Sequence, residues 1–283
     1  MTHDPFDLDA YLTRIGHDGA RDPSLPVLAS LVARHSAAIA FENIEALARR
    51  PIPLDLPSLQ RKLIQGGRGG YCYEQNTLFQ GALRALGFRV AGLMARVRRQ
   101  VPPAMETARS HMLLRVDLPE GPYIADVGFG GLTPTAPLAL RAADAQPTPN
   151  ETFRLLPVGE EFMLQAYIAG DWDDVYRFTL QEERPADYEQ ANWYTATRPN
   201  AMFAHNLIVT LPARGVRRTL FNRHFTERHR DKPMERRVLR SRGDYHDVLR
   251  GAFGLTLTED DLDAVMNVVA KHDPDAPYGG NFA

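Results

Sequence analysis

GGRGGYCYEQN, residues 66–76, joins a glycine-rich loop to the start of a predicted helix and carries Cys72, the only cysteine of the chain. A thiol at a helix N-terminus lies at the positive end of the helix dipole, which favours the nucleophilic thiolate. The glycines allow a second backbone or a ligand to approach closely. A lone cysteine is more often a small buried apolar residue. The glycine loop and the helix start together favour a nucleophile at this position.

Composition places the chain among folded, soluble proteins, since 44% of its 283 residues are hydrophobic and 24% are charged. A single cysteine excludes an intrachain disulfide. The formal net charge of −2 gives no support for a nucleic-acid or anionic-membrane partner. Residues 1–5 lack the features of a signal peptide, and no stretch reaches the roughly 18 apolar residues of a membrane-spanning helix. We therefore predict a cytoplasmic protein without nucleic-acid or membrane partners, of undetermined oligomeric state.

Hydrophobic periodicity divides the chain into three regions, residues 1–88, 89–200 and 201–283, and a chain of this length can hold two or three small domains or one large one. Apolar residues at helical spacing predict a helical first region, whose last helix begins at Cys72. Alternating patterns between turn signals predict that the second region is an antiparallel sheet or barrel. Its predicted strands are residues 88–97, 111–118, 123–129, 153–158, 162–168 and 175–180. The third region mixes strand and helix signals, so the predicted fold class is α+β.

A catalytic thiolate needs a base, and the base needs a group that orients it. Of the nine histidines, His111 stands out because Ser110 and His111 open a predicted strand after the long loop 100–110. Asp126 lies inside an apolar predicted strand, where a carboxylate must have a partner because an unpaired buried charge is costly. One possible partner is an arginine or a set of backbone amides. The other is the imidazole of His111. The histidines and the single cysteine show no metal-ligand spacing, so no metal site is predicted.

The hairpin that joins the two strands tests whether His111 and Asp126 can meet. With Glu120 and Gly121 as the central turn residues, both side chains face the same side of the sheet but lie four positions out of register, roughly 13 Å apart. Direct contact then needs an asymmetric loop, a bulge, or a turn centred nearer residues 118–119. Strand geometry predicts the shared face and leaves the contact open.

Four motifs follow one another along the chain: FENI at residues 41–44, RGGYCYEQN at 68–76, SHMLLRV at 110–116 and DVGFGG at 126–131. In order and spacing they resemble the motifs of the arylamine N-acetyltransferase family. Several independent motifs are far more specific than any one of them. The resemblance extends from about residue 6 to at least residue 211.

The resemblance implies a catalytic triad of Cys72, His111 and Asp126, so the hairpin turn should be longer or shifted. It also implies a helical bundle, a β-barrel and a C-terminal α/β lid, with a catalytic core similar to that of cysteine proteases. The implied reaction carries an acetyl group from acetyl-CoA, as cosubstrate, to the nitrogen of an arylamine or arylhydrazine, as in xenobiotic metabolism. It would be a ping-pong reaction through an acetyl-cysteine. The backbone N–H of Cys72 is a candidate oxyanion donor.

The resemblance also implies which residues meet the substrates. The substrate-binding positions are Phe41, Val97, Ser110, Phe129 and Phe203. The coenzyme A contacts are Gly128, Gly130 and Gly131. Glycines on either side of Phe129 allow this loop to approach a ligand closely and to turn its amides toward the coenzyme.

Arg68 and Glu42 are interpreted as structural rather than catalytic residues. We predict an ion pair between them that ties the loop before Cys72 to the first domain. Two well-separated side chains would reject this prediction.

Three other functions remain open at this stage. An amide synthase of the same family would share the triad and differ in the width of its cleft and in its acyl donor. A cysteine hydrolase or transglutaminase would share the triad logic without the full set of motifs. A non-enzymatic binding module is disfavoured, because all three triad residue types are present.

Overall fold

The N-terminal part of the chain is helical, as its hydrophobic spacing predicts, in a computed structural model that describes residues 6–140, 144–230 and 232–275. Its elements are α1 (Leu8–Arg14), α2 (Leu25–Ala38), β1 (Phe41–Glu42), α3 (Ile44–Leu47), α4 (Leu56–Leu59), the π-helical segment η1 (Gln60–Gln65) and α5 (Cys72–Ala85). Cys72 is the first residue of α5, so the thiol lies at the predicted helix start. Among the described residues, no helix is long and apolar enough to cross a membrane.

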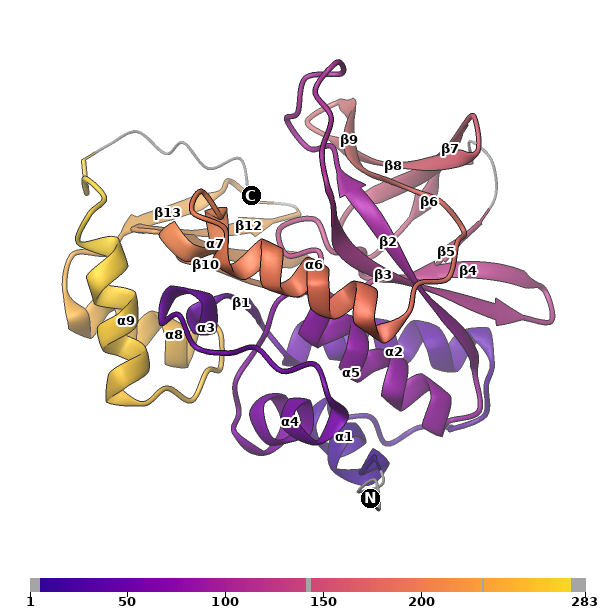
Figure 1. Ribbon diagram of the computed structural model, residues 1–283, viewed down its shortest axis with the longest axis horizontal. Helices are drawn as coiled ribbons and strands as arrows, with labels where there is room; N and C mark the ends of the chain where they lie inside the picture. Colours follow the sequence, from indigo (N-terminus) through magenta and orange to yellow (C-terminus); the bar gives the residue numbers. More distant parts are fainter. Residues whose placement is uncertain (1–5, 141–143, 231, 276–283) are drawn as a thin grey trace.

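The middle of the chain forms an eight-stranded antiparallel sheet in the order β5-β4-β3-β2-β9-β8-β7-β6. The strands are β2 (Arg89–Val97), β3 (Arg109–Leu118), β4 (Gly121–Ala125), β5 (Leu138–Ala139), β6 (Gln146–Pro147), β7 (Thr152–Val158), β8 (Glu161–Ile168) and β9 (Asp171–Phe178). Its two edges approach each other, because the side-chain amide of Gln146 makes hydrogen bonds of 2.7 and 2.9 Å to the backbone of Ala139. The sheet is a nearly closed barrel (Figure 1), which confirms the predicted antiparallel architecture.

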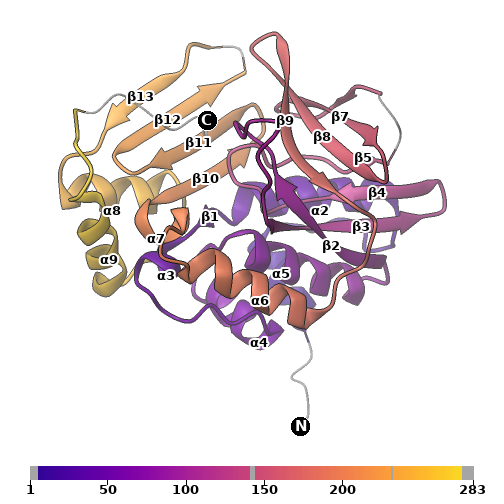
Figure 2. The same ribbon diagram turned by 45° about the horizontal axis from the view of Figure 1, so that its top comes forward.

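Among the described residues that follow the barrel, a second sheet and four further helices are present. The elements of this part are α6 (Pro185–Thr197), α7 (Met202–His205), β10 (Ile208–Ala213), β11 (Val216–Phe221), β12 (His224–His229), β13 (Glu235–Val238), α8 (Arg242–Gly251) and α9 (Glu259–Val269). This sheet has the order β1-β10-β11-β12-β13, with Phe41 of β1 opposite Thr210. The N-terminal part therefore contributes an edge strand to the C-terminal sheet. Figure 2 shows that sheet beside the barrel, with α8 and α9 next to it.

Both faces of β3 are buried, and this fixes the position of the helix that begins with the cysteine. Met112 and Leu114 pack in the same core cluster as the apolar side chains of α5, whereas Leu113 belongs to the cluster inside the barrel. Successive side chains of a strand point to opposite faces, so one apolar run can serve both clusters. The strand that begins near His111 is thus packed directly against the helix of Cys72.

The β3–β4 hairpin turns one residue earlier than the geometry considered from the sequence. Leu118 pairs with Gly121, so residues 119–120 form the turn. This register leaves His111 and Asp126 two positions apart instead of four. Because β4 ends at the residue before Asp126, the chain is also free to bend toward β3 there. The expectation of a shifted turn is confirmed.

A β-bulge in β3 lies at the same end of the hairpin. Ala95 pairs with His111 and Arg96 pairs with Arg109, which leaves Ser110 as the extra residue. Bulges bend a strand and re-aim its side chains, and they are common beside active sites. The carbonyl oxygen of Ser110 lies 3.9 Å from the Sγ of Cys72, so the bulge is located where β3 meets the thiol.

Candidate active site

The loop before α5 is held by close contacts that glycine permits. A Cβ atom at Gly69 would collide with the carbonyl oxygen of Ala40, and one at Gly70 would lie 2.8 Å from the Cβ of Glu74. The amide of Gly70 donates to the carbonyl of Ala40 at 3.2 Å. The side-chain amide of Gln75 donates to the carbonyl of Ala40 at 2.9 Å and to the carbonyl of Gly70 at 3.2 Å. These contacts determine where the loop ends and α5 begins.

The predicted ion pair between Arg68 and Glu42 is confirmed, with an N–O distance of 2.8 Å. Arg68 also pairs with Asp261 of α9 at 3.0 Å and with Glu45 at 3.2 Å. Burial raises the pKa of Glu42, but the charges of Arg68 and Lys62 outweigh it and lower that pKa overall. The cluster therefore joins the loop before Cys72 to β1 and α3 on one side and to α9 on the other.

His111 and Asp126 are in direct contact, with 2.7 Å between Nε2 and Oδ2, and both side chains are buried. The other carboxylate oxygen accepts hydrogen bonds from the side-chain amide of Asn76 at 3.0 Å and from the amide of Gly128 at 2.9 Å. Burial alone would raise the pKa of Asp126, but His111 and these hydrogen bonds lower it. The carboxylate is thus held ionised against the imidazole.

The charge on His111 follows from its two neighbours. Burial lowers the pKa of the imidazole, but the Asp126 carboxylate and a hydrogen bond with the Cys72 thiol raise it to about 10. Since Nε2 is bound to Asp126, Nδ1 is the ring nitrogen left for the thiol. The three residues form a connected chain of sulfur, imidazole and carboxylate, in which the ring is protonated at neutral pH.

Aromatic rings fix the orientation of the imidazole. The ring centroids of Phe129 and Tyr176 each lie 5.0 Å from that of His111, and they lie 5.3 Å from each other. The ring of Phe129 stands nearly perpendicular to the imidazole, at 89°. Burial and the nearby Asp126 carboxylate hold the pKa of Tyr176 well above its usual value. A neutral phenol and an apolar ring therefore exclude water from one side of the triad.

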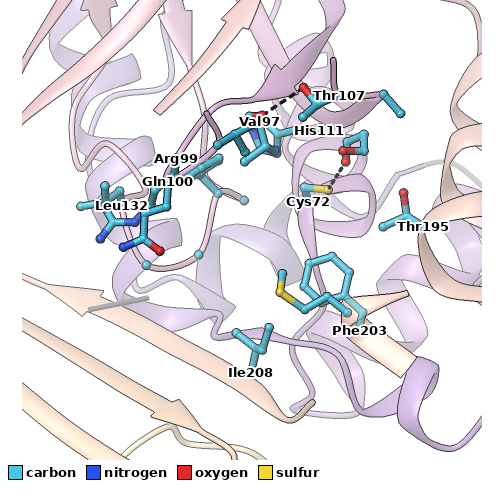
Figure 3. Close-up of a pocket in the computed structure, with 18 of the residues that line it drawn as sticks. Cys72, Val97, Arg99, Gln100, Thr107, His111, Leu132, Thr195, Phe203 and Ile208 are labelled. Carbon is cyan, nitrogen blue, oxygen red and sulfur yellow. Dashed lines mark hydrogen bonds between the residues drawn. The ribbon is translucent and has the colours of Figure 1, made fainter. Parts of the chain in front are cut away.

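A cavity of about 540 Å³ opens at Cys72 and His111 (Figure 3). All eight residues predicted to contact substrate or coenzyme line it: Phe41, Val97, Ser110, Phe129, Phe203, Gly128, Gly130 and Gly131. Asp126 lies behind the imidazole and is not part of the lining. The sulfur and one face of the ring are therefore accessible to a small molecule, while the carboxylate is protected.

Comparison with known proteins agrees with this arrangement. A family model described as N-acetyltransferase matches residues 24–262. The arylamine N-acetyltransferase of Escherichia coli (strain K12) is 39% identical over 94% of this chain and 97% of its own length. The chain belongs to the arylamine N-acetyltransferase family. It is accordingly an acyltransferase, as the four motifs indicate.

Solved structures of arylamine N-acetyltransferases share this fold. The Mycobacterium marinum enzyme has a TM-score of 0.89 and 37% identity, with 93% of this chain and 100% of that chain covered. The same enzyme in complex with CoA has a TM-score of 0.88 and 36% identity, covering 93% of this chain and 99% of that one. The mixed helix and barrel architecture is thus that of the family.

Two glycines in the loop after Asp126 are explained by close packing in this family member. A Cβ atom at Gly128 would lie 2.9 Å from the Cα of Cys72 and 2.8 Å from the amide nitrogen of Asn76. Gly130 has a φ of +83°, and a Cβ atom there would lie 3.5 Å from the ring of Phe41. Gly128 allows the loop to contact the start of α5, and Gly130 allows it to turn beside the cavity.

Asn76 and Tyr176 take part in the site although the sequence reasoning did not select them. Asn76 follows Cys72 by four residues, so the two side chains lie on the same face of α5. Its amide also donates to the carbonyl of Met112 at 2.8 Å, and its oxygen accepts from the amide of Val127 at 3.2 Å. That spacing was a usable signal for Asn76. Tyr176 lies in an ordinary strand, and nothing local to it marks a role.

Among the residues that the structure describes, no three His, Cys, Asp or Glu side chains gather as metal ligands would. The acidic cluster around Arg68 is occupied by arginines instead, since Arg68 and Arg50 both pair with Asp261.

Proposed function

We propose that this chain transfers an acetyl group from acetyl-CoA to the nitrogen of an arylamine or arylhydrazine by a ping-pong mechanism. Cys72 is the nucleophile, His111 the acid and base, and Asp126 the group that orients and charges His111. The observation that carries this proposal is the chain of contacts from the Cys72 thiol through His111 to Asp126 at a cavity of about 540 Å³.

The first half-reaction exchanges one thioester for another. The thiol proton resides on His111, so a thiolate–imidazolium pair is the resting form. The Cys72 sulfur attacks the acetyl carbonyl carbon, and the oxyanion that develops is stabilised by the backbone N–H of Cys72 at the start of α5. The bond to the coenzyme sulfur then breaks. His111 gives its proton to the departing coenzyme A thiolate and becomes neutral.

The second half-reaction reverses these roles. An arylamine enters the cavity after coenzyme A leaves, and its nitrogen lone pair attacks the acetyl-cysteine carbonyl. Neutral His111 takes the proton that the nitrogen loses, and the Cys72 thiolate departs. The thiolate–imidazolium pair is restored, and no proton is gained or lost by the enzyme over the cycle.

Cavity lining supports the binding assignments within this proposal. The apolar side chains Phe41, Val97, Phe129 and Phe203 suit an aromatic acceptor, with Ser110 beside the thiol. Gly128, Gly130 and Gly131 bring backbone close to the cavity and are the proposed coenzyme A contacts. The solved complex of the Mycobacterium marinum relative with CoA supports acetyl-CoA as the donor.

Each of the three proposed domains has its own role in this reaction. Residues 1–88 form the helical bundle that carries the nucleophile. Residues 89–200 carry the acid–base pair in the barrel. Residues 201–283 form an α/β lid, and Phe203 from this part lines the cavity opposite the barrel residues.

Initial-rate kinetics test the order of events. Acetyl-CoA and a single-ring arylamine such as aniline are varied together, and double-reciprocal plots are expected to give parallel lines because the first product leaves before the second substrate binds. Lines that intersect would mean that both substrates bind together, which is incompatible with a free acetyl-enzyme.

A further inference from the structure

The loop between β2 and β3, residues 98–108, forms one wall of the cavity. Its side chains that line the cavity include Arg99, Gln100, Val101, Met105, Glu106 and Thr107. Figure 3 shows Val97, Arg99 and Gln100 along the same side of the cavity. The shape of this wall therefore decides what fits beside the thiol.

Arg98 is the residue of the loop whose buried side chain is hydrogen-bonded to the backbone of the loop tip. Arg98 is only 8% exposed, and its guanidinium donates to three backbone carbonyls of the loop tip. The distances are 2.6 Å from Nη1 to Met105, 3.0 Å from Nη2 to Pro102 and 3.2 Å from Nη2 to Pro103. The backbone amide of Arg98 donates to Val175 of β9 at 2.9 Å. Arg98 thus connects the tip of the wall to the barrel.

Two backbone hydrogen bonds of the loop are local. Val101 donates to the carbonyl of Arg98 at 3.1 Å, and Met105 donates to the carbonyl of Pro102 at 2.9 Å, so each bond closes a single turn. Gln100 has a φ of +55°, a conformation that is uncommon for a residue with a side chain. The guanidinium of Arg98 joins the two turns to each other.

Arginine is suited to this task because of its geometry. Its planar fork presents several N–H donors in fixed directions, and the three acceptors here are neutral carbonyls. A methionine would fill similar space and leave all three carbonyls without this donor. A lysine would keep the charge but has one nitrogen, which cannot reproduce the fork.

The wall is placed to contact the part of a substrate that lies away from the reacting atom. The base of the wall is at the reacting end of the cavity, since the carbonyl oxygen of Ser110 lies 3.9 Å from Cys72 Sγ and Val97 lines the same cavity. The oxygen of Val97 also accepts from the Thr107 hydroxyl at 3.1 Å, which closes the base of the loop. The tip held by Arg98 is several residues further along the loop, and we expect only larger substrates to reach it.

We propose that Arg98 is a positioning residue that sets how large an acceptor the cavity accepts, an inference that rests on the proposed acetyl-transfer function. Arg98 acts on the substrate through the wall and does not touch the triad. Its loss loosens the wall, so a two-ring amine loses its contacts while a single-ring amine near the thiol keeps most of its own.

The test compares Arg98→Met and Arg98→Lys with the wild type, using aniline as the single-ring acceptor and para-aminobiphenyl as the two-ring acceptor. For Arg98→Met we expect the KM for the two-ring acceptor to rise about tenfold and the KM for aniline to change by less than about twofold, with kcat for aniline retained. Arg98→Lys is expected to fall between Arg98→Met and the wild type. Arg154→Met, which removes an arginine of β7 outside the cavity lining, is the matched control and should change neither KM.

Two further measurements separate the possible failures. Hydrogen exchange at the amides of Val101 and Met105 should speed up in Arg98→Met, and this readout needs no activity. Alkylation of Cys72 by iodoacetamide should keep its wild-type rate. Equal increases of KM for both acceptors, slower alkylation of Cys72, or unchanged hydrogen exchange in the loop would each overturn the proposal.

If the wild type acetylates no amine, the proposed function fails, while the exchange data still decide whether Arg98 holds the wall. If Arg98→Met does not fold, Arg98→Lys carries the same comparison.

Discussion

His111 has a buried carboxylate on one side and a thiol on the other, and each partner raises the pKa of the imidazole, which reaches about 10. The ring therefore stays protonated well above neutral pH, in contrast to an ordinary histidine with a pKa near 6.5. A positive ring beside Cys72 is the arrangement that the proposed thiolate–imidazolium pair requires. At the scale of single residues, the proposed reactivity of the sulfur therefore rests on Asp126.

We predict that Asp126→Asn keeps the fold but disrupts this charge pattern. An asparagine amide that donates to Nε2 forces the remaining imidazole proton onto Nδ1, where it faces the sulfur and the ring no longer acts as a base. The pKa of His111 falls, so iodoacetamide alkylation of Cys72 should need a higher pH, and kcat/KM should drop by about a thousandfold or more.

Asp117→Asn is the matched control for that change, since Asp117 is a carboxylate of β3 that is paired with Arg115 away from the triad. It should leave the alkylation profile and kcat/KM unchanged. An Asp126→Asn variant with the wild-type pH profile would contradict the role given to the carboxylate.

Single residues also show where sequence reasoning works. A buried carboxylate in an apolar segment has to be paired, and this argument correctly predicted that Asp126 has a partner, although β4 ends one residue before it. It left His111 as one of several partners, because the choice depended on a one-residue shift of the hairpin turn. Tyr176 escaped notice because its neighbour His111 is far away in the sequence and is brought near only by the pairing of β2 with β9.

At the scale of helices and strands, alternation and helical spacing predicted most of the barrel strands and the helix of Cys72, because these signals are local. Several elements were not predicted, namely the helices α3, α6 and α7 and the strands β1, β5, β6, β12 and β13. α6 follows the last barrel strand with a mixed pattern of polar and apolar residues. β1 has only two residues, and it is a strand because β10 lies beside it. β1 therefore depends on a tertiary contact, whereas α6 begins with Pro185 and a capping Asp187, which are start signals in its own sequence.

Helix α9 is connected to the loop before α5 by an ion pair between Arg68 and Asp261, with 3.0 Å between Nη1 and Oδ2. We predict that Asp261→Asn lowers the free energy of unfolding by about 3 kcal/mol, because a buried arginine loses one of its charged partners. Asparagine keeps an oxygen for the cap of α9, so the change removes mainly charge. Urea unfolding measures the effect.

Asp263→Asn on the same helix is the control. Asp263 pairs with Arg242 at the surface, where solvent screens the interaction, so little change in stability is expected. Equal stabilities for the Asp261 and Asp263 variants would show that the buried cluster does not connect α9 to the loop.

At the scale of the whole molecule, the cavity exists because three separate parts of the chain meet. α5 contributes Cys72, the barrel contributes His111 and Phe129, and the segment after α6 contributes Phe203 and Ile208. Figure 3 shows Cys72, His111, Phe203 and Ile208 around one space. Periodicity along the chain could predict the helices and strands but not how they assemble around one cavity. The four motifs indicated that assembly only through their resemblance to a known family.

Intact-protein mass spectrometry tests the central claim, that Cys72 carries the acetyl group between donor and acceptor. The wild type is mixed with acetyl-CoA and no amine, with Cys72→Ser as the control. We expect the wild type to gain the mass of one acetyl group on Cys72 and to lose it when an arylamine is added, while Cys72→Ser gains none. An unmodified Cys72 in a preparation that nevertheless acetylates the amine would contradict the account.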